Sequence, residues 1–225
     1  MPYPERVIKS LDRGAAHIAA NNPQLAIPDL EKVVAKTPKA FEGWAMLGQA
    51  RSMLDEHAES ERCYRKAVLL NPKNYEILFG LGLALSSQGK YQDATVYYLR
   101  AIDVARTDPI NAVQNLASCH LESGNFAEAA EIYLALARQT DNGNFWALLG
   151  MARQGQAQYK EALNAYQCAL ERGLDACALN IRSSECARLM GDGTGAIHYA
   201  QTALTVSPGN PAAQACLELA STPAL

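Results

Sequence analysis

A small residue recurs at nearly constant spacing along this chain of 225 residues, and that repeat constrains the fold more than any other feature. The intervals between its occurrences are 34, 34, 35, 33 and 34 residues, and the residues are Ala26, Ser60, Ala94, Ala129, Ala162 and Ala196. Residues 89–94 and 124–129 share the pattern Gly-x-aromatic-x-x-Ala, and residues 157–162 match it more loosely. A repeat of this length predicts stacked copies of one small unit, because a single copy cannot bury its own apolar face.

The residue types within one copy predict two antiparallel helices joined by a short turn. In the second copy, Gly48 and Ser60 are small enough for the two helix backbones to approach closely, and Tyr64 fills the space beside that contact. Pro72 is expected to stop the second helix, because the residue before a proline avoids the helical conformation. A glycine such as Gly89, in the third copy, permits the left-handed conformation that ends a first helix.

This pattern resembles the tetratricopeptide repeat family over residues 7 to about 210, in six copies that start near residues 7, 41, 75, 110, 143 and 177. The second copy matches the family motif at Trp44, Leu47, Gly48, Tyr64, Ala67 and Pro72. The fifth copy matches it at Trp146, Leu149, Gly150, Ala162, Tyr166 and Ala169. The resemblance implies an all-α, right-handed superhelical solenoid of helix-turn-helix repeats that forms a single domain over residues 1–225.

The two ends of the chain depart from the pattern, as terminal repeats do. Pro28 falls inside the second helix of the first copy, so that helix is expected either to start late or to kink. Residues 211–220 (PAAQACLELA) predict a short helix that caps the last repeat. Residues 221–225 (STPAL) are expected to fray.

Composition and charge disfavour several classes of function. The net charge is −3 and the isoelectric point about 5.8, so a basic surface for nucleic acid is not expected. The longest apolar stretch, residues 77–85, is far too short for a membrane span. Residues 1–14 contain no apolar signal segment, so we expect no secretory signal and a cytoplasmic location.

No catalytic, cofactor or metal constellation stands out. The six cysteines include no Cys-x-x-Cys pair, and His120 points about 100° away from Cys119 around a helix. The glycine-rich run of residues 191–195 follows no strand and carries no lysine, so it predicts a turn and not a phosphate loop. We therefore expect free structural thiols, no cofactor, no metal and no enzymatic activity.

In the resembled family, the first helices of the repeats line a concave groove that binds partners. The residues mapped to that groove are Gln49, Met53, Phe79, Leu83, Asn111, Gln114, Ser118, Asn144 and Met151. The central groove positions include no Lys or Arg, which disfavours a clamp for a terminal carboxylate. Amide and apolar side chains instead suit an extended or helical peptide segment of another protein. The alternative is that Phe79, Leu83 and Met151 only pack against neighbouring helices.

Residues 78–139 also resemble the class II chaperones of bacterial type III secretion. The shared features are Leu81-Gly82, Gly89-Lys90-Tyr91, Asp108-Pro109 and the run from Ser118 to Gly124. That resemblance implies a chaperone that keeps hydrophobic translocator proteins soluble. We expect a protein-protein interaction module that serves as an adaptor, scaffold or chaperone, with a secretion chaperone and a scaffold for pilus or organelle assembly as the alternatives.

Overall fold

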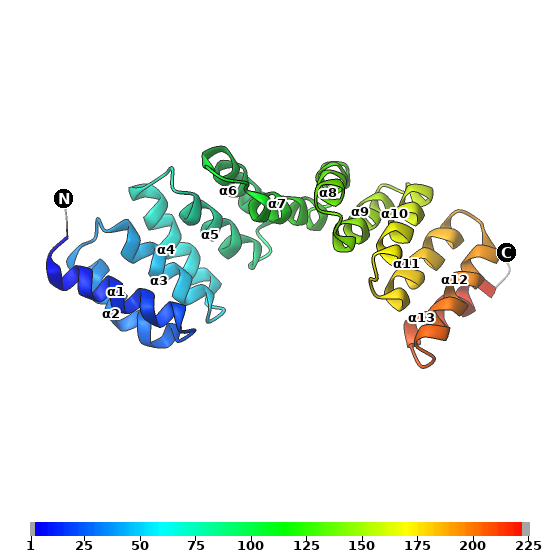
Figure 1. Ribbon diagram of the computed structural model, residues 1–225, viewed down its shortest axis with the longest axis horizontal. Helices are drawn as coiled ribbons and strands as arrows, with labels where there is room; N and C mark the ends of the chain where they lie inside the picture. The colour runs from blue at the N-terminus through cyan, green and yellow to red at the C-terminus, as the bar shows by residue number, and fades with distance from the viewer. Residues whose placement is uncertain (1–2, 222–225) are drawn as a thin grey trace. The chain divides into compact units, whose positions relative to one another are not determined.

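A computed structural model of the protein describes residues 3–221, and this part of the chain is all-α, as predicted (Figure 1). Helices that follow one another pack in sequential pairs, and the described residues form no strand. The helices are α1 (Glu5–Ala19), α2 (Pro23–Lys36), α3 (Phe41–Ser52), α4 (His57–Leu70), α5 (Tyr75–Ser86), α6 (Tyr91–Val104), α7 (Ile110–Glu122), α8 (Phe126–Thr140), α9 (Gly143–Gly155), α10 (Tyr159–Glu171), α11 (Ala176–Leu189), α12 (Gly193–Val206) and α13 (Pro211–Ser221).

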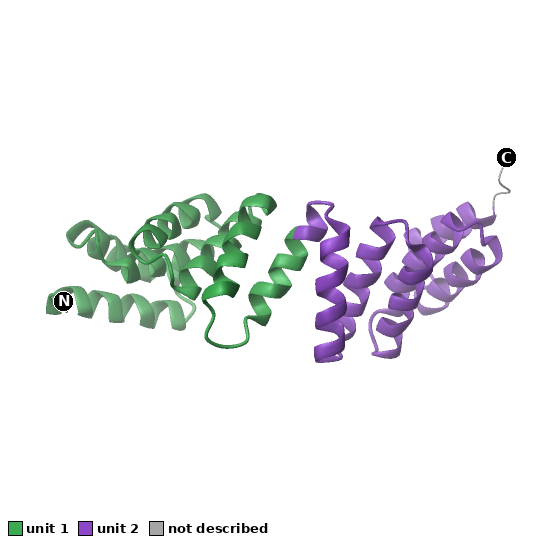
Figure 2. Ribbon diagram, turned by 90° about the horizontal axis from the view of Figure 1, so that it is seen from above, with its two compact units in different colours: residues 1–119 green, residues 120–225 purple. Residues whose placement is uncertain are grey.

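The chain divides into two compact units, residues 1–119 and residues 120–225 (Figure 2). Unit 1 holds α1 to α6 and most of α7, and its buried core includes Leu11, Leu30 and Leu47. Unit 2 holds α8 to α13, and one of its core clusters is built around Tyr166 and Leu179. The single domain over residues 1–225 and its six repeat starts stay predictions.

The close approach of paired helices depends on the small residues of the motif. The recurring small residue is fully buried in all six copies. In the second copy, the Ser60 hydroxyl donates a hydrogen bond of 2.8 Å to the carbonyl of Gly48 across the helix pair. A Cβ atom added to Gly48 would lie 2.9 Å from the Tyr64 ring, which leaves no room for a side chain. The sequence therefore fixes which faces of the two helices meet.

Helix α2 runs without interruption from Pro23 to Lys36, with Pro28 inside it. The expectation that this helix starts late is wrong, because Pro23 already occupies its first turn, where the missing N–H costs nothing. Pro28 removes one hydrogen bond, to the carbonyl of Gln24 one turn earlier. Both residues are exposed, so water can solvate that carbonyl.

Helix α13 packs against α12 and α11 at the end of unit 2. The side chain of Asn210 caps it by accepting hydrogen bonds from the backbone N–H groups of Ala212 and Ala213. The tail expected to fray lies outside the described residues, apart from Ser221. In the described part of the chain, no helix combines the length and apolar character needed to cross a membrane.

Candidate functional site

Helices α3 and α5 lie side by side in unit 1, and their facing side chains enclose a recess of about 300 Å³. We call this recess the α3–α5 pocket. Its lining residues are Ala45, Met46, Gln49, Ser52, Met53, Tyr64, Glu76, Phe79, Gly80 and Leu83. Four of the residues predicted from sequence, Gln49, Met53, Phe79 and Leu83, thus come together in one place.

The apolar wall of the pocket comes mainly from α5. Phe79 and Leu83 are half-buried and lie one helical turn apart, so both side chains project from one face of the helix. The Phe79 ring stacks on Tyr75, with 5.8 Å between ring centroids, and lies 5.9 Å from the Tyr98 ring. Phe79 therefore both packs within the protein and lines the pocket.

The opposite wall comes from α3 and its C-terminal end. Met53 is 38% exposed, so its flexible thioether chain is available to a ligand. Gln49 is exposed, and its amide can both donate and accept hydrogen bonds. The two walls together offer a ligand apolar side chains and one amide group. This combination is what the sequence predicted for a peptide-binding groove.

Tyr64 of α4 also lines the pocket, and only 8% of its surface is exposed. Its ring lies against Gly48 on one side and Gly80 on the other. Burial raises the pKa of the Tyr64 hydroxyl, and the nearby carboxylate of Glu76 raises it further. The hydroxyl therefore stays protonated and can donate a hydrogen bond at any ordinary pH.

The pocket carries very little charge. Glu76, at the start of α5, is the one ionisable acid or base among its lining residues apart from the Tyr64 phenol. A pocket without Lys or Arg offers no ion pair to a ligand carboxylate. The arrangement therefore favours neutral or positively charged groups over acidic ones.

The remaining predicted residues do not line the α3–α5 pocket. Asn111 and Gln114 are exposed on α7 of unit 1, and Ser118 is half-buried there. In unit 2, Asn144 is exposed on α9, whereas Met151 packs against the core cluster that contains Tyr166. For Met151 the structure shows the packing contact that the sequence left open as an alternative.

Sequence reasoning missed Tyr64, Gly80 and Met46 as lining residues. Tyr64 and Met46 occupy motif positions that usually pack between helices. Gly80 did leave a signal, because the sixth position of its copy is glycine only there. The matching residues of the other copies from the second to the sixth are Met46, Asn115, Leu148 and Arg182.

A second recess of about 400 Å³ lies between α4 and α6. Arg65, Leu69, Tyr97 and Arg100 are among its lining residues. The guanidinium carbons of the two arginines lie 6.0 Å and 5.4 Å from the centroid of the Tyr97 ring, within the range of a cation–π contact. This recess is the competing surface for a partner.

Chemistry based on thiols finds little support in the geometry. Burial raises the pKa of Cys63 and of Cys186 to about 11, so both are thiols and weak nucleophiles at neutral pH. Within residues 3–221, no group of three or more His, Cys, Asp and Glu side chains is placed to hold a metal ion.

Comparison with known families agrees with the repeat geometry. Three family models, each described as tetratricopeptide repeat, match residues 41–74, 63–95 and 85–152. The chain is a tetratricopeptide repeat protein. Tetratricopeptide repeats form protein-binding modules and are generally not enzymes, so this chain is a protein-binding module.

Among its relatives, this tetratricopeptide repeat protein is 27% identical to human Superkiller complex protein 3 over 157 residues. The match covers 63% of this chain but only 10% of the human protein, so the chain spans about a tenth of that relative's length. The name of the human protein marks it as part of a complex.

Two solved structures share the fold. PilW, described as a widely conserved type IV pilus biogenesis factor, is 18% identical, with a TM-score of 0.71 and coverage of 96% of this chain and all of PilW. YrrB, described as a tetratricopeptide repeat protein with an unusual peptide-binding site, is 13% identical, with a TM-score of 0.72 and coverage of 84% and 97%. At these identities the likeness shows the fold alone.

Proposed function

We propose that this tetratricopeptide repeat protein acts as an adaptor or scaffold that holds a peptide segment of another protein in the α3–α5 pocket. The observation that carries the proposal is the meeting of Gln49, Met53, Phe79 and Leu83 around one nearly uncharged recess. Partly exposed apolar side chains next to an amide suit a ligand that offers both an apolar anchor and a backbone.

The size of the pocket limits how much of the ligand it can take. Ligand pockets typically measure about 300–1,000 Å³, so a recess of about 300 Å³ suits one apolar side chain and its backbone. An unstructured segment loses entropy when it binds. We therefore expect affinity near the micromolar range, or about −8 kcal/mol.

Further contacts are proposed for the other groove residues. Asn111, Gln114 and Ser118 on α7 present polar side chains, as does Asn144 on α9. Amide side chains of this kind can hold the backbone of an extended ligand. Met151 is proposed as a weaker contact, because its side chain already packs in the core of unit 2.

The two narrower roles would use the same surface. A secretion chaperone would place an anchor segment of a hydrophobic translocator protein there, a role supported by the resemblance of residues 78–139. A scaffold for pilus or organelle assembly would place a segment of an assembly protein there, a role supported by the shared fold with PilW.

Selection from random peptides displayed on phage tests the proposal. The test variant is Met53→Ser with Leu83→Ser, which removes apolar lining and spares Phe79, whose ring packs on Tyr98. The matched control is Arg65→Ser with Arg100→Ser in the α4–α6 recess. Circular dichroism checks that both variants keep wild-type helicity.

We expect peptides selected on the wild-type protein to bind the arginine variant normally and to lose at least tenfold in affinity for the Met53/Leu83 variant. The opposite pattern, with binding lost only in the arginine variant, would move the interface to the α4–α6 recess and refute the proposal.

A further inference from the structure

A tyrosine occupies the same motif position in four copies, and the hydroxyls of three of them, Tyr64, Tyr98 and Tyr166, differ in their hydrogen-bond partners. The Tyr98 hydroxyl lies 3.2 Å from the Ser86 hydroxyl, and the Tyr166 hydroxyl donates to the side-chain oxygen of Gln154 at 2.7 Å. The equivalent hydroxyl of Tyr64 makes no hydrogen bond to any residue in the described range, although Ser52 occupies the position that corresponds to Ser86. Tyr64 thus presents an unused donor at the floor of the α3–α5 pocket.

Gly80 explains why this hydroxyl is left open. A Cβ atom at Gly80 would lie 2.4 Å from Cζ of Tyr64 and 2.7 Å from its hydroxyl oxygen, so any other residue would occupy the space beside that oxygen. In the last copy the same motif position is Arg182, whose positive charge lies near enough to the Tyr166 hydroxyl to oppose the rise in its pKa that burial causes. Because Gly80 has no side chain, the Tyr64 hydroxyl faces the recess and is not covered.

An open donor in an apolar recess is a strong recognition element. A ligand that covered this hydroxyl without offering it an acceptor would bind poorly, because a buried hydroxyl without a partner loses its hydrogen bonds to water. A peptide ligand carries such an acceptor in the carbonyl next to each side chain. An apolar anchor and a carbonyl bond to Tyr64 therefore fit one residue of a bound segment.

The carboxylate of Glu76 should make the pocket prefer neutral or positively charged ligands over negatively charged ones. It is the one carboxylate among the lining residues, and Lys and Arg are absent from that set. A ligand carboxylate beside the anchor would meet a like charge, whereas an ammonium group or a neutral amide would not. The expected preference is modest and salt-dependent, because Glu76 is exposed.

We propose that Tyr64 is a specificity-determining residue that donates a hydrogen bond to a carbonyl of the bound segment. The apolar side chain of the same ligand residue fills the space beside Phe79 and Leu83, and the flanking groups are neutral or positively charged. This inference rests on the proposed function, since it defines the kind of segment that the α3–α5 pocket accepts.

Three small probes that differ in charge test the inference by titration into isotope-labelled protein, followed by NMR. They are N-acetylphenylalaninamide, which is neutral, phenylalaninamide, which is cationic, and N-acetylphenylalanine, which is anionic. We expect the neutral and cationic probes to shift resonances of α3 and α5, and the anionic probe to bind about threefold more weakly at low salt.

Tyr64→Phe removes the hydroxyl and keeps the ring that packs on Gly48 and Gly80. It should weaken binding of the neutral probe about fivefold while the melting temperature stays unchanged or rises, because no internal hydrogen bond is lost. The matched control Tyr166→Phe should leave probe binding unchanged and lower the melting temperature, because it removes the bond to Gln154. A purely structural role for Tyr64 predicts no change in binding.

The outcomes separate the two proposals. Binding that is lost with Met53→Ser and Leu83→Ser but unchanged with Tyr64→Phe would overturn the role of Tyr64 and leave the proposed function standing. Tighter binding of the anionic probe would overturn the charge preference. If the three probes give no shifts in α3 or α5 of the wild-type protein, the anchor pocket is refuted, and the phage-selected peptides then decide the proposed function separately.

Discussion

At the scale of single residues, each turn between paired helices contains one residue in the left-handed region. The six residues recur at the repeat spacing and have φ values between 57° and 80°: Asn21, Asp55, Gly89, Gly124, Ala157 and Gly191. Glycine adopts this conformation freely, and Asn and Asp tolerate it. Ala157 has neither advantage, because its Cβ is strained there and its side chain offers no local hydrogen bond.

Ala157→Gly should therefore stabilise the protein. Removing the Cβ relieves a strain of about 1–2 kcal/mol, and the greater freedom of glycine in the unfolded chain offsets part of that gain. We expect a net increase of about 0.5–1 kcal/mol in the free energy of unfolding, measured with urea.

The reverse substitution Gly124→Ala is the matched control. Gly124 has φ of 77°, and no atom lies within 4 Å of the place where a Cβ would be added, so the backbone alone sets the effect. Gly124→Ala should lower the free energy of unfolding by about 1 kcal/mol. Equal stability of both variants and the wild type would show that these turns do not depend on residue type.

Ala152→Leu tests the packing between helices. Ala152 is fully buried on α9, so three extra heavy atoms have no space and should cost about 1–3 kcal/mol. Ala135→Leu, at an exposed site on α8, is the control that adds the same atoms without overpacking. A wild-type melting temperature for Ala152→Leu would show that the repeat register is misplaced.

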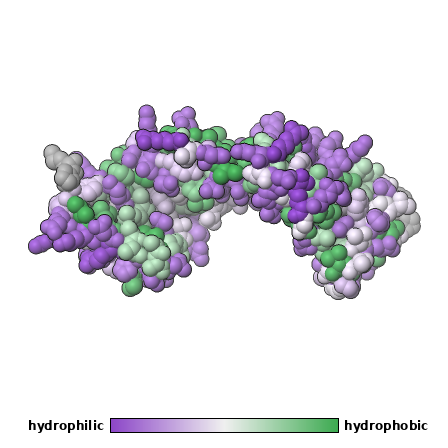
Figure 3. Space-filling model, in the orientation of Figure 1, coloured by the Kyte–Doolittle hydropathy of each residue, from purple (hydrophilic) through white to green (hydrophobic). Residues whose placement is uncertain are grey.

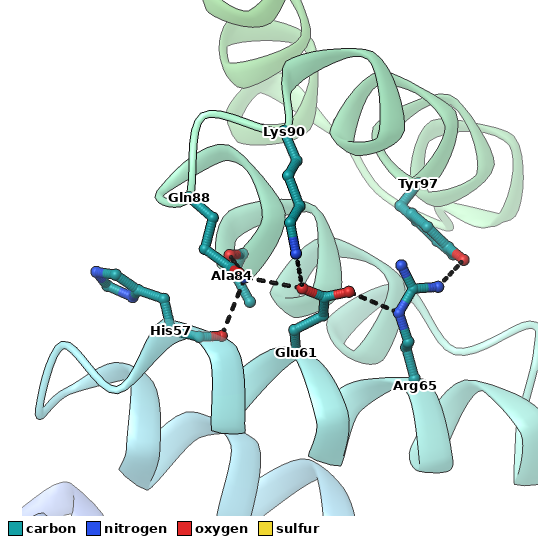
Figure 4. A network of polar contacts seen from close by, with 7 residues as sticks. All are labelled: His57, Glu61, Arg65, Ala84, Gln88, Lys90 and Tyr97. Atoms are coloured by element: carbon teal, nitrogen blue, oxygen red, sulfur yellow. Dashed lines mark hydrogen bonds and ion pairs between the residues drawn. The ribbon is translucent and has the colours of Figure 1, made fainter.

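At the scale of elements, a polar network connects α4 to the turn between α5 and α6 (Figure 4). One carboxylate oxygen of Glu61 accepts from Arg65 at 2.7 Å, and the other accepts from Gln88 at 2.9 Å and Lys90 at 2.7 Å. Gln88 also donates to the carbonyls of Ala84 and His57. Glu61 therefore links one helix pair to the next.

This network makes stability depend on pH. Burial of Glu61 acts to raise its pKa, but the hydrogen bonds from Lys90, Arg65 and Gln88 outweigh burial and lower the pKa from 4.5 to about 2. A carboxyl group with a lower pKa in the folded state stabilises the protein above its unfolded pKa. That contribution, on the order of 2 kcal/mol, should be lost as the pH falls from about 5 to about 2.

Urea unfolding of wild-type protein and Glu61→Gln at several pH values measures this effect. The difference between them should be largest near neutral pH and should shrink toward pH 2, where the wild-type carboxyl is also neutral. Glu59→Gln, whose side chain is 47% exposed beside Arg62, should change stability by less than about 1 kcal/mol. A constant difference at all pH values would contradict the role assigned to Glu61.

The sequence predicted the elements well because each boundary has a local cause. A left-handed residue ends each first helix, and small buried residues such as Ser60 fix the facing sides. The site was predicted only in part. Whether Phe79 faces a pocket depends on the contact between Gly80 of the third copy and Tyr64 of the second copy. A motif that is read within one copy does not show a contact between two copies. The path of α2 through Pro28 likewise depends on solvent exposure.

At the scale of the whole molecule, two surfaces of unit 1 compete for a partner. The α3–α5 pocket is nearly uncharged, whereas the α4–α6 recess carries two arginines around Tyr97. Hydrophobic residues come to the surface in patches among hydrophilic ones on the face drawn in Figure 3, so hydrophobic exposure alone does not identify the interface. The available hydrogen-bond donor of Tyr64 favours the α3–α5 pocket.

Hydrogen exchange of the full chain, followed by mass spectrometry with and without a phage-selected peptide, tests the central claim most directly. Binding in the α3–α5 pocket should slow exchange in Phe41–Ser52 and Tyr75–Ser86 and leave exchange in Tyr91–Val104 unchanged. Slower exchange confined to His57–Leu70 and Tyr91–Val104, with α3 and α5 unaffected, would contradict the account.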